Sequence, residues 1–121
     1  MELDFSLQLV DKNITLAALT KKAQVTFGDM VKAVVDVEKG VMVIGGELHA
    51  DCEHYLLDRG SNQVDLWGIN LYPAYFGSEE FIEFDSLINI RPKEGNRSTD
   101  VEDERKRQQI TAVVNNLVTN D

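Results

Sequence analysis

The sequence predicts an α+β fold: a two-layer sandwich in which three helices cover one face of a mainly antiparallel sheet of four to five strands. Three observations predict it. Several segments alternate apolar and polar residues, as half-buried strands do. Three other segments carry apolar residues at helical spacing. A tight turn between two of the strands indicates antiparallel pairing. The expected order is β-α-β-β-α-β-β-α, which packs as one sheet against helices.

The chain begins with a predicted strand and helix. Residues 4–10 alternate apolar and polar side chains and predict a short strand. A helix is expected next, because Thr15 is a suitable N-cap and Gly28 a suitable end. Its apolar stripe consists of Leu16, Leu19 and Ala23.

A β-hairpin is predicted over residues 30–47. Lys39 and Gly40 form its two-residue loop in this interpretation. The register then places Val35 opposite Ile44 and keeps the apolar residues on one face of the sheet.

The second half continues with a helix over residues 48–59 and two strands over 64–72 and 80–91. Thr99 and Glu102 form a capping box that predicts the last helix. The apolar stripe of that helix consists of Ile110, Val113, Val114 and Leu117.

Size and charge restrict the class of protein. The 121 residues predict a single domain, residues 1–121, and 43% are hydrophobic, as in globular proteins. A net charge of −9 argues against nucleic acid and anionic membranes as partners. Cys52 stands alone, so no internal disulfide is expected. The chain shows neither a membrane-spanning run nor a signal peptide, and we expect a cytoplasmic protein.

The sheet face turned away from the helices mixes polar and aliphatic side chains. Its predicted aliphatic members are Val34, Val41, Val43, Leu66 and Leu87, and the candidate interface residues among them are Val34, Val43, Leu66 and Leu87. Three interpretations of this face remain open. It is a solvated outer face of an antiparallel sheet, a surface for self-association, or a small-molecule site.

Several polar residues on or near this face are candidates for ligand binding. They are Glu47, His49, Asn70, Asp85, Asn89, Arg91 and Arg97. In this hypothesis Asp85 or His49 serves as a base, and the arginines hold an anionic group. The spacing of histidines and acids matches no metal signature, so we expect neither a metal nor a cofactor. Whether the protein is an enzyme stays open.

Four blocks of the sequence resemble a family of short bacterial proteins known only as domain of unknown function 5674. The blocks are Gly46-Glu-Leu-His-Ala-Asp51, Leu66-Trp-Gly-Ile-Asn-Leu-Tyr-Pro73, Ile82-Glu-Phe-Asp-Ser-Leu-Ile-Asn-Ile-Arg-Pro92, and Gly95-Asn-Arg-Ser98 followed by Val101-Glu-Asp103. The resemblance implies a single-domain bacterial protein without an assigned activity, and it supplies no functional residues.

The first functional hypothesis is an interaction module that associates with itself or a partner through the aliphatic residues of the open sheet face. The alternative is a protein that binds a small anionic molecule, or a hydrolase. Its site would lie on the same sheet face and on the loop of residues 91–98.

Overall fold

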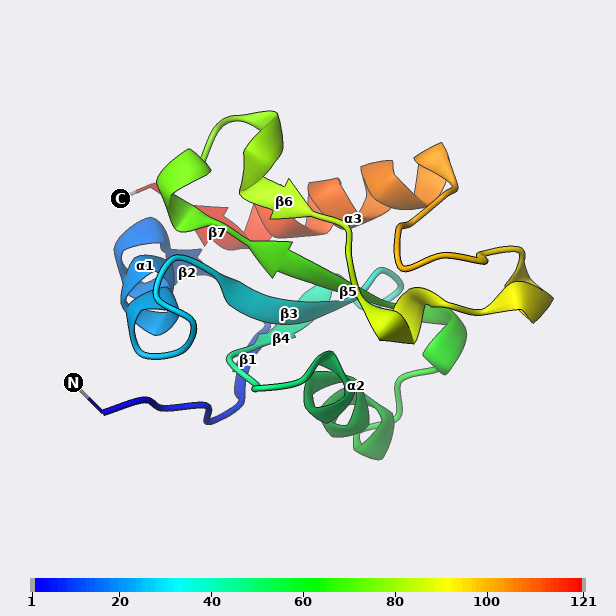
Figure 1. Ribbon diagram of the computed structural model, residues 1–121, viewed down its shortest axis with the longest axis horizontal. Helices are drawn as coiled ribbons and strands as arrows, with labels where there is room; N and C mark the ends of the chain where they lie inside the picture. The colour runs from blue at the N-terminus through cyan, green and yellow to red at the C-terminus, as the bar shows by residue number, and fades with distance from the viewer. Residues whose placement is uncertain (1, 121) are drawn as a thin grey trace.

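The computed structural model describes residues 2–120, which form a five-stranded antiparallel sheet with three α-helices (Figure 1). The order of the strands is β1-β4-β3-β5-β6. They span Gln8–Val10 (β1), Val31–Asp36 (β3), Val41–Ile44 (β4), Leu66–Leu71 (β5) and Ile82–Glu83 (β6). The predicted α+β class and the antiparallel sheet are therefore confirmed.

The three α-helices are α1 (Leu16–Gln24), α2 (His49–Asp58) and α3 (Glu104–Leu117). Thr15 caps α1 as predicted, since its side chain accepts a hydrogen bond from the N–H of Ala18. Asp103, rather than Thr99, caps α3. Within the described part of the chain, none of the helices has the length and apolar character needed to cross a membrane.

Short elements connect these parts. A small parallel pair joins β2 (Ile14–Thr15) to β7 (Val118–Thr119) and so ties the start of α1 to the end of α3. Five 3₁₀ helices are η1 (Gln63–Asp65), η2 (Pro73–Tyr75), η3 (Glu79–Phe81), η4 (Leu87–Asn89) and η5 (Pro92–Glu94).

The helices lie on both faces of the sheet, so the prediction of three helices on one face is wrong in this respect. One core contains side chains of α1 and α3 with one face of the sheet: Leu19, Ala23, Ile110, Val114, Val31, Val35, Met42, Ile44 and Ile69. A second core joins α2 to the opposite face: Val34, Val43, Cys52, Leu56 and Leu66. Figure 1 shows α2 and α3 on opposite sides of the strands. The aliphatic residues of both faces are covered, which is why neither face is fully polar.

The β3–β4 hairpin has a longer turn than predicted. Asp36 pairs with Val41, so residues 37–40 form the loop instead of two residues. The cause is the buried Asp36 side chain, whose Oδ1 accepts hydrogen bonds from the N–H groups of Glu38 and Lys39. The register shift is two residues, and therefore every side chain stays on its predicted face.

The predicted strand over residues 80–91 is also shorter than expected. Only Ile82–Glu83 pairs with β5. Beyond it, the side chain of Asn89 replaces a strand: Oδ1 accepts from Gly68 N (2.9 Å), and Nδ2 donates to Gly68 O (3.0 Å). A Cβ at Gly68 would lie 2.6 Å from the side chain of Ser86, so only glycine leaves room for this segment.

The position of α2 leads to a stability prediction. Val43 is fully buried beneath α2, whereas Leu87 is 78% exposed. We expect Val43→Glu to lower the free energy of unfolding by about 3 kcal/mol or more, because it buries an unpaired charge. Leu87→Glu should change it by less than about 0.5 kcal/mol. Urea denaturation followed by circular dichroism measures both, and a Val43→Glu protein of wild-type stability would contradict the packing of α2.

Candidate functional site

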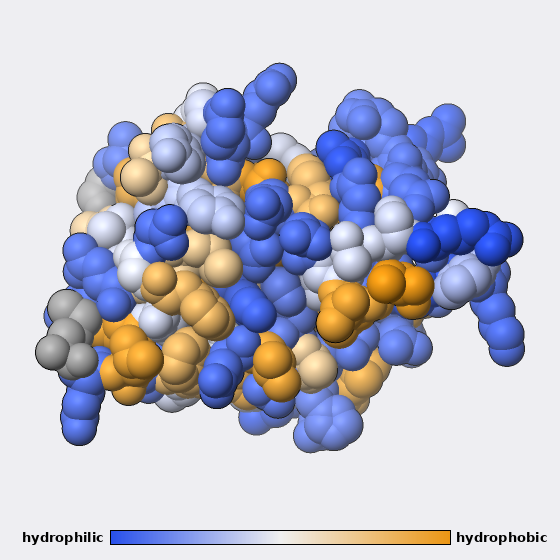
Figure 2. Space-filling model, viewed as in Figure 1, coloured by the Kyte–Doolittle hydropathy of each residue, from blue (hydrophilic) through white to orange (hydrophobic). Residues whose placement is uncertain are grey.

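A cleft of about 660 Å³ lies between the start of α2 and the segment that runs from β6 to η4. Its polar lining consists of Lys32, His49, Asn70, Tyr72, Glu83, Asp85, Ser86 and Thr99. Leu48 and Leu87 also line it and are both well exposed. Figure 2 shows polar surface over β5 and β6, with apolar patches over η4 and near the start of α2. Met30, Ala50 and Ile88 also line the cleft, which thus combines polar groups with apolar side chains.

Asn70 organises the wall formed by β5 and β6. Its Nδ2 donates to Glu83 Oε1 (2.9 Å) and to the carbonyl oxygen of Asp85 (3.2 Å). Both partners are acceptors, which fixes the orientation of the amide. Tyr72 also donates its hydroxyl to Glu83 Oε1 (3.2 Å).

The amide oxygen of Asn70 is left without a partner. The residue is 5% exposed, and its Oδ1 makes no hydrogen bond within residues 2–120. Buried polar atoms are normally satisfied, and one that is not needs an explanation. With His49 neutral, this acceptor in the wall of the cleft therefore has no donor; protonation of the His49 ring would supply one, since a hydrogen bond to the Asn70 side chain raises the pKa of His49.

His49 is the first residue of α2 and is also buried. Its Nε2 lies 2.8 Å from the carbonyl oxygen of Ile69. Since a carbonyl only accepts, Nε2 carries the proton of the neutral ring and Nδ1 is an acceptor. Burial lowers the pKa of His49, an effect that the hydrogen bonds to the carbonyl oxygen of Ile69 and to the side chain of Asn70 oppose. The imidazole is consequently neutral at pH 7.

The charged groups of the cleft carry a net negative charge. Glu83 and Asp85 supply two exposed carboxylates. Lys32 supplies one ammonium group, whose Nζ lies 5.1 Å from the ring centroid of Phe27. Across the described residues, no cluster of His, Cys, Asp and Glu side chains could hold a metal ion. The cleft is thus suited to hydrogen-bond donors and positive charge.

Of the predicted ligand-binding residues, the structure brings together His49, Asn70 and Asp85. The alternation of the predicted sheet face placed Asn70 and Asp85 on one side and did so correctly. Lys32, Tyr72 and Glu83 were not among the predicted ligand-binding residues, although the same period of two puts them on this face. Glu47 precedes α2, is exposed, and does not line the cleft.

The two predicted anion-binding arginines lie elsewhere. The guanidinium of Arg91 stacks over Trp67, 4.0 Å from its ring centroid, and donates to the carbonyl oxygen of Gln63. Glu94 lies 3.9 Å from its Nε, so a carboxylate already opposes its charge. Arg97 is exposed and does not line the cleft. Nε and Nη2 of Arg91 make no hydrogen bond among the described residues. Both arginines lie outside the cleft that holds His49, Asn70 and Asp85, so the predicted residues do not come together in one place.

The predicted interface is wrong for three of its four residues. Val34, Val43 and Leu66 are 0% exposed because α2 covers them. Leu87 remains exposed, at the rim of the cleft.

Asn89 and Asn96 shape the loop that follows the cleft. Asn89 is fully buried and binds Gly68 and the carbonyl oxygen of Thr99. Asn96 donates to the carbonyl oxygens of Asn89, Ser98 and Asp100, and its Oδ1 accepts from the N–H of Glu102. Asn89 is thus a structural residue rather than a ligand, and Asn96 is one that the sequence analysis missed.

The lone cysteine is not a nucleophile for this site. Cys52 belongs to the core beneath α2. Burial raises the pKa of its thiol to about 11, so the thiolate is scarce at neutral pH.

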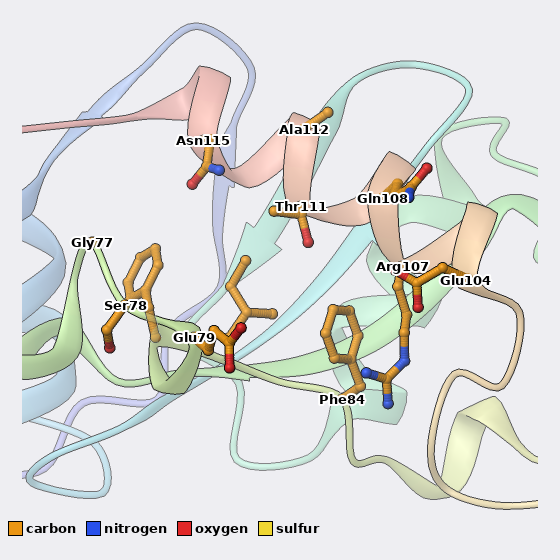
Figure 3. Close-up of a pocket in the computed structure, with 12 residues that line it drawn as sticks. Gly77, Ser78, Glu79, Phe84, Glu104, Arg107, Gln108, Thr111, Ala112 and Asn115 are labelled. Atoms are coloured by element: carbon orange, nitrogen blue, oxygen red, sulfur yellow. The ribbon is translucent and has the colours of Figure 1, made fainter.

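A larger groove, of about 840 Å³, lies on the other side of β6, between α3 and the segment of residues 77–84 (Figure 3). Thr111 and Asn115 point from α3 toward this segment, and Arg107 lies over the ring of Phe84 at 4.6 Å from its centroid. Of the unpaired buried polar atoms of the described chain, Asn70 Oδ1 belongs to the cleft and none belongs to this groove; the others are in Trp67 and Arg91, which line neither. The cleft is therefore the better candidate for recognising a small polar molecule.

A family model for proteins of unknown function, DUF5674, matches residues 8–117. The chain belongs to the DUF5674 family. This match confirms the resemblance of the four sequence blocks and includes every residue of the cleft. No curated protein and no solved structure matches this DUF5674 chain.

His49 should make the stability of this DUF5674 protein depend on pH. Because its pKa is lower when folded, the unfolded chain binds more protons, and stability falls as pH drops below the unfolded pKa of about 6.5. We expect His49→Gln to reduce this loss between about pH 7 and pH 5.5. His54→Gln, at an exposed position of the same helix, is the matched control. Urea titrations at each pH test this, and equal pH slopes for wild type and His49→Gln would refute it.

Asn89 should contribute strongly to stability. Asn89→Ala removes the donors and the acceptor that pair with Gly68 and leaves buried backbone groups unsatisfied. We expect a loss of about 2–4 kcal/mol. Asn116→Ala, at an exposed position on α3, should cost less than about 0.5 kcal/mol. Thermal or urea unfolding measures both variants, and similar values for the two would show that Asn89 does not hold this loop.

Proposed function

We propose that this DUF5674 protein binds a small polar molecule in the cleft, and that the ligand donates hydrogen bonds, as an amine or a hydroxyl compound does. The unpaired Oδ1 of Asn70 is the single observation that carries the proposal. A buried polar atom without a partner costs about 1–3 kcal/mol, and a ligand donor would offset that cost.

The surrounding groups favour the same chemistry. Asp85 and Glu83 are acceptors, and so is the Nδ1 of neutral His49. Two carboxylates against one ammonium give the cleft a net negative charge. A ligand with a positive charge or several donors fits this wall, whereas a carboxylate or phosphate would meet like charges.

Size and rim also support a small ligand. Binding pockets for small molecules have volumes of about 300–1,000 Å³, and the cleft lies within this range at about 660 Å³. Leu48 and Leu87 could contact a short apolar part of the ligand. Recognition by a few polar groups inside an otherwise apolar surround is the usual arrangement in such sites.

The proposal is testable with a panel of small primary amines, alcohols, amides and carboxylic acids, screened by saturation-transfer NMR. We expect amines and hydroxyl compounds to bind and carboxylic acids not to bind. Asn70→Ala and Asp85→Asn should each weaken binding by about tenfold or more, equivalent to about 1.4 kcal/mol. Asp58→Asn, at the far end of α2 and outside the cleft, is the charge-matched control.

Two results would contradict the proposal. One is preferential binding of carboxylic acids. The other is binding that Asn70→Ala and Asp85→Asn leave unchanged. Circular dichroism of each variant ensures that a loss of binding is not a loss of folding, and Asp85, being exposed, offers the variant with the smaller effect on stability.

A further inference from the structure

The outer edge of β6 has free backbone groups. β6 is the last strand of the sheet, and Glu83 pairs with Asn70. The N–H of Tyr72 donates to the carbonyl oxygen of Phe81. Because hydrogen-bonding residues alternate in an antiparallel pair, the N–H and C=O of Ile82, and of Phe84 after it, point away from β5. They have no backbone partner on that side among the described residues.

Three hollows meet at this edge. Ile82 and Phe84 line the groove beside α3. Glu83 and Asp85 line the cleft on the opposite face. A third hollow, of about 360 Å³, is lined by Tyr72, Tyr75, Glu80, Ile82 and Glu83. Space is therefore present on both faces of the strand edge, where alternate side chains of a neighbouring strand would point.

We propose that an extended, lysine- or arginine-containing segment of a partner protein adds to β6 as a further strand. In this mode of recognition, main-chain hydrogen bonds provide affinity and alternate hollows provide specificity. The backbone N–H and C=O groups of Ile82 and Phe84 would make the main-chain hydrogen bonds. The groove and the third hollow would receive the side chains of the added strand and so provide specificity.

The hollows select basic side chains. The groove combines the apolar side chains of Phe81, Ile82 and Phe84 with the carboxylates of Glu79 and Glu104. The third hollow combines Tyr72 and Tyr75 with Glu80 and Glu83. A lysine or arginine places its aliphatic stem on apolar surface and its charge at a carboxylate. The Arg107 charge is already paired with Asp100. The net charge of −9 adds a long-range attraction for such a segment.

The same charges disfavour a second copy of this chain. Edge-to-edge pairing of two β6 strands would bring Glu83 and its acidic neighbours against their counterparts, and like charges directly opposite are destabilising. The two-residue length of β6 further limits self-pairing. A basic partner segment avoids the charge repulsion, and the short strand limits it to a few main-chain hydrogen bonds.

The test uses a fluorescein-labelled short peptide in which lysine and valine alternate. Its comparator has the same sequence and charge but carries N-methyl groups on alternate peptide bonds, so it cannot pair with a strand. We expect the first peptide to bind at about 0.15 M salt and the second to bind at least about tenfold more weakly. Bound peptide should also slow hydrogen exchange at the amides of Ile82 and Phe84.

A pair of variants locates the site. Asn115→Trp fills the groove, whereas Asn116→Trp, the next residue of α3, lies outside its lining. The first should weaken binding by about tenfold or more and the second should leave it unchanged. Equal binding of the two peptides would reduce the interaction to charge attraction and overturn the proposal. So would the absence of binding at about 1 mM protein, or unchanged exchange at Ile82 and Phe84.

Discussion

The hydrogen bonds between the Asn89 side chain and the backbone of Gly68 determine the shape of the end of the protein that holds the cleft. They take the place of a continued β5–β6 ladder, and therefore the chain leaves the sheet after Glu83. Ser86 occupies the space that a side chain at position 68 would need. The segment that departs becomes one wall of the cleft, and the short strand left behind becomes the exposed edge.

The segment of residues 82–85 connects the two candidate sites. Its side chains alternate, so Glu83 and Asp85 belong to the cleft while Ile82 and Phe84 belong to the groove. Asn70 holds both the side chain of Glu83 and the carbonyl of Asp85. The cleft and the groove are thus built from neighbouring residues of one short segment, with different side chains facing each of them.

Much of the fold follows from local pattern. The alternation of β3 and β4 places Val35 and Ile44 on one face. The predicted pairing register was wrong by two residues, but side chains alternate with a period of two, so the predicted faces are still correct. Thr15 was recognisable as a cap because the motif is local. The strand predicted over residues 80–91 was too long. The side chain of Asn89 makes the hydrogen bonds to Gly68 that a strand backbone would make, and this substitution leaves no trace in the alternation of apolar residues.

The sequence by itself determined the α+β class, the face on which each residue of β3, β4 and β5 lies, and the shared side of Asn70 and Asp85. Only the tertiary structure decided which helix covers which face. Aliphatic residues on both faces, such as Val34 and Val35, show that both are buried, but periodicity does not name the element that buries them. Because α2 packs on the second face, most residues of the predicted interface are buried in a core beneath it. The same packing places the first residue of α2, His49, with Asn70 in the lining of the cleft.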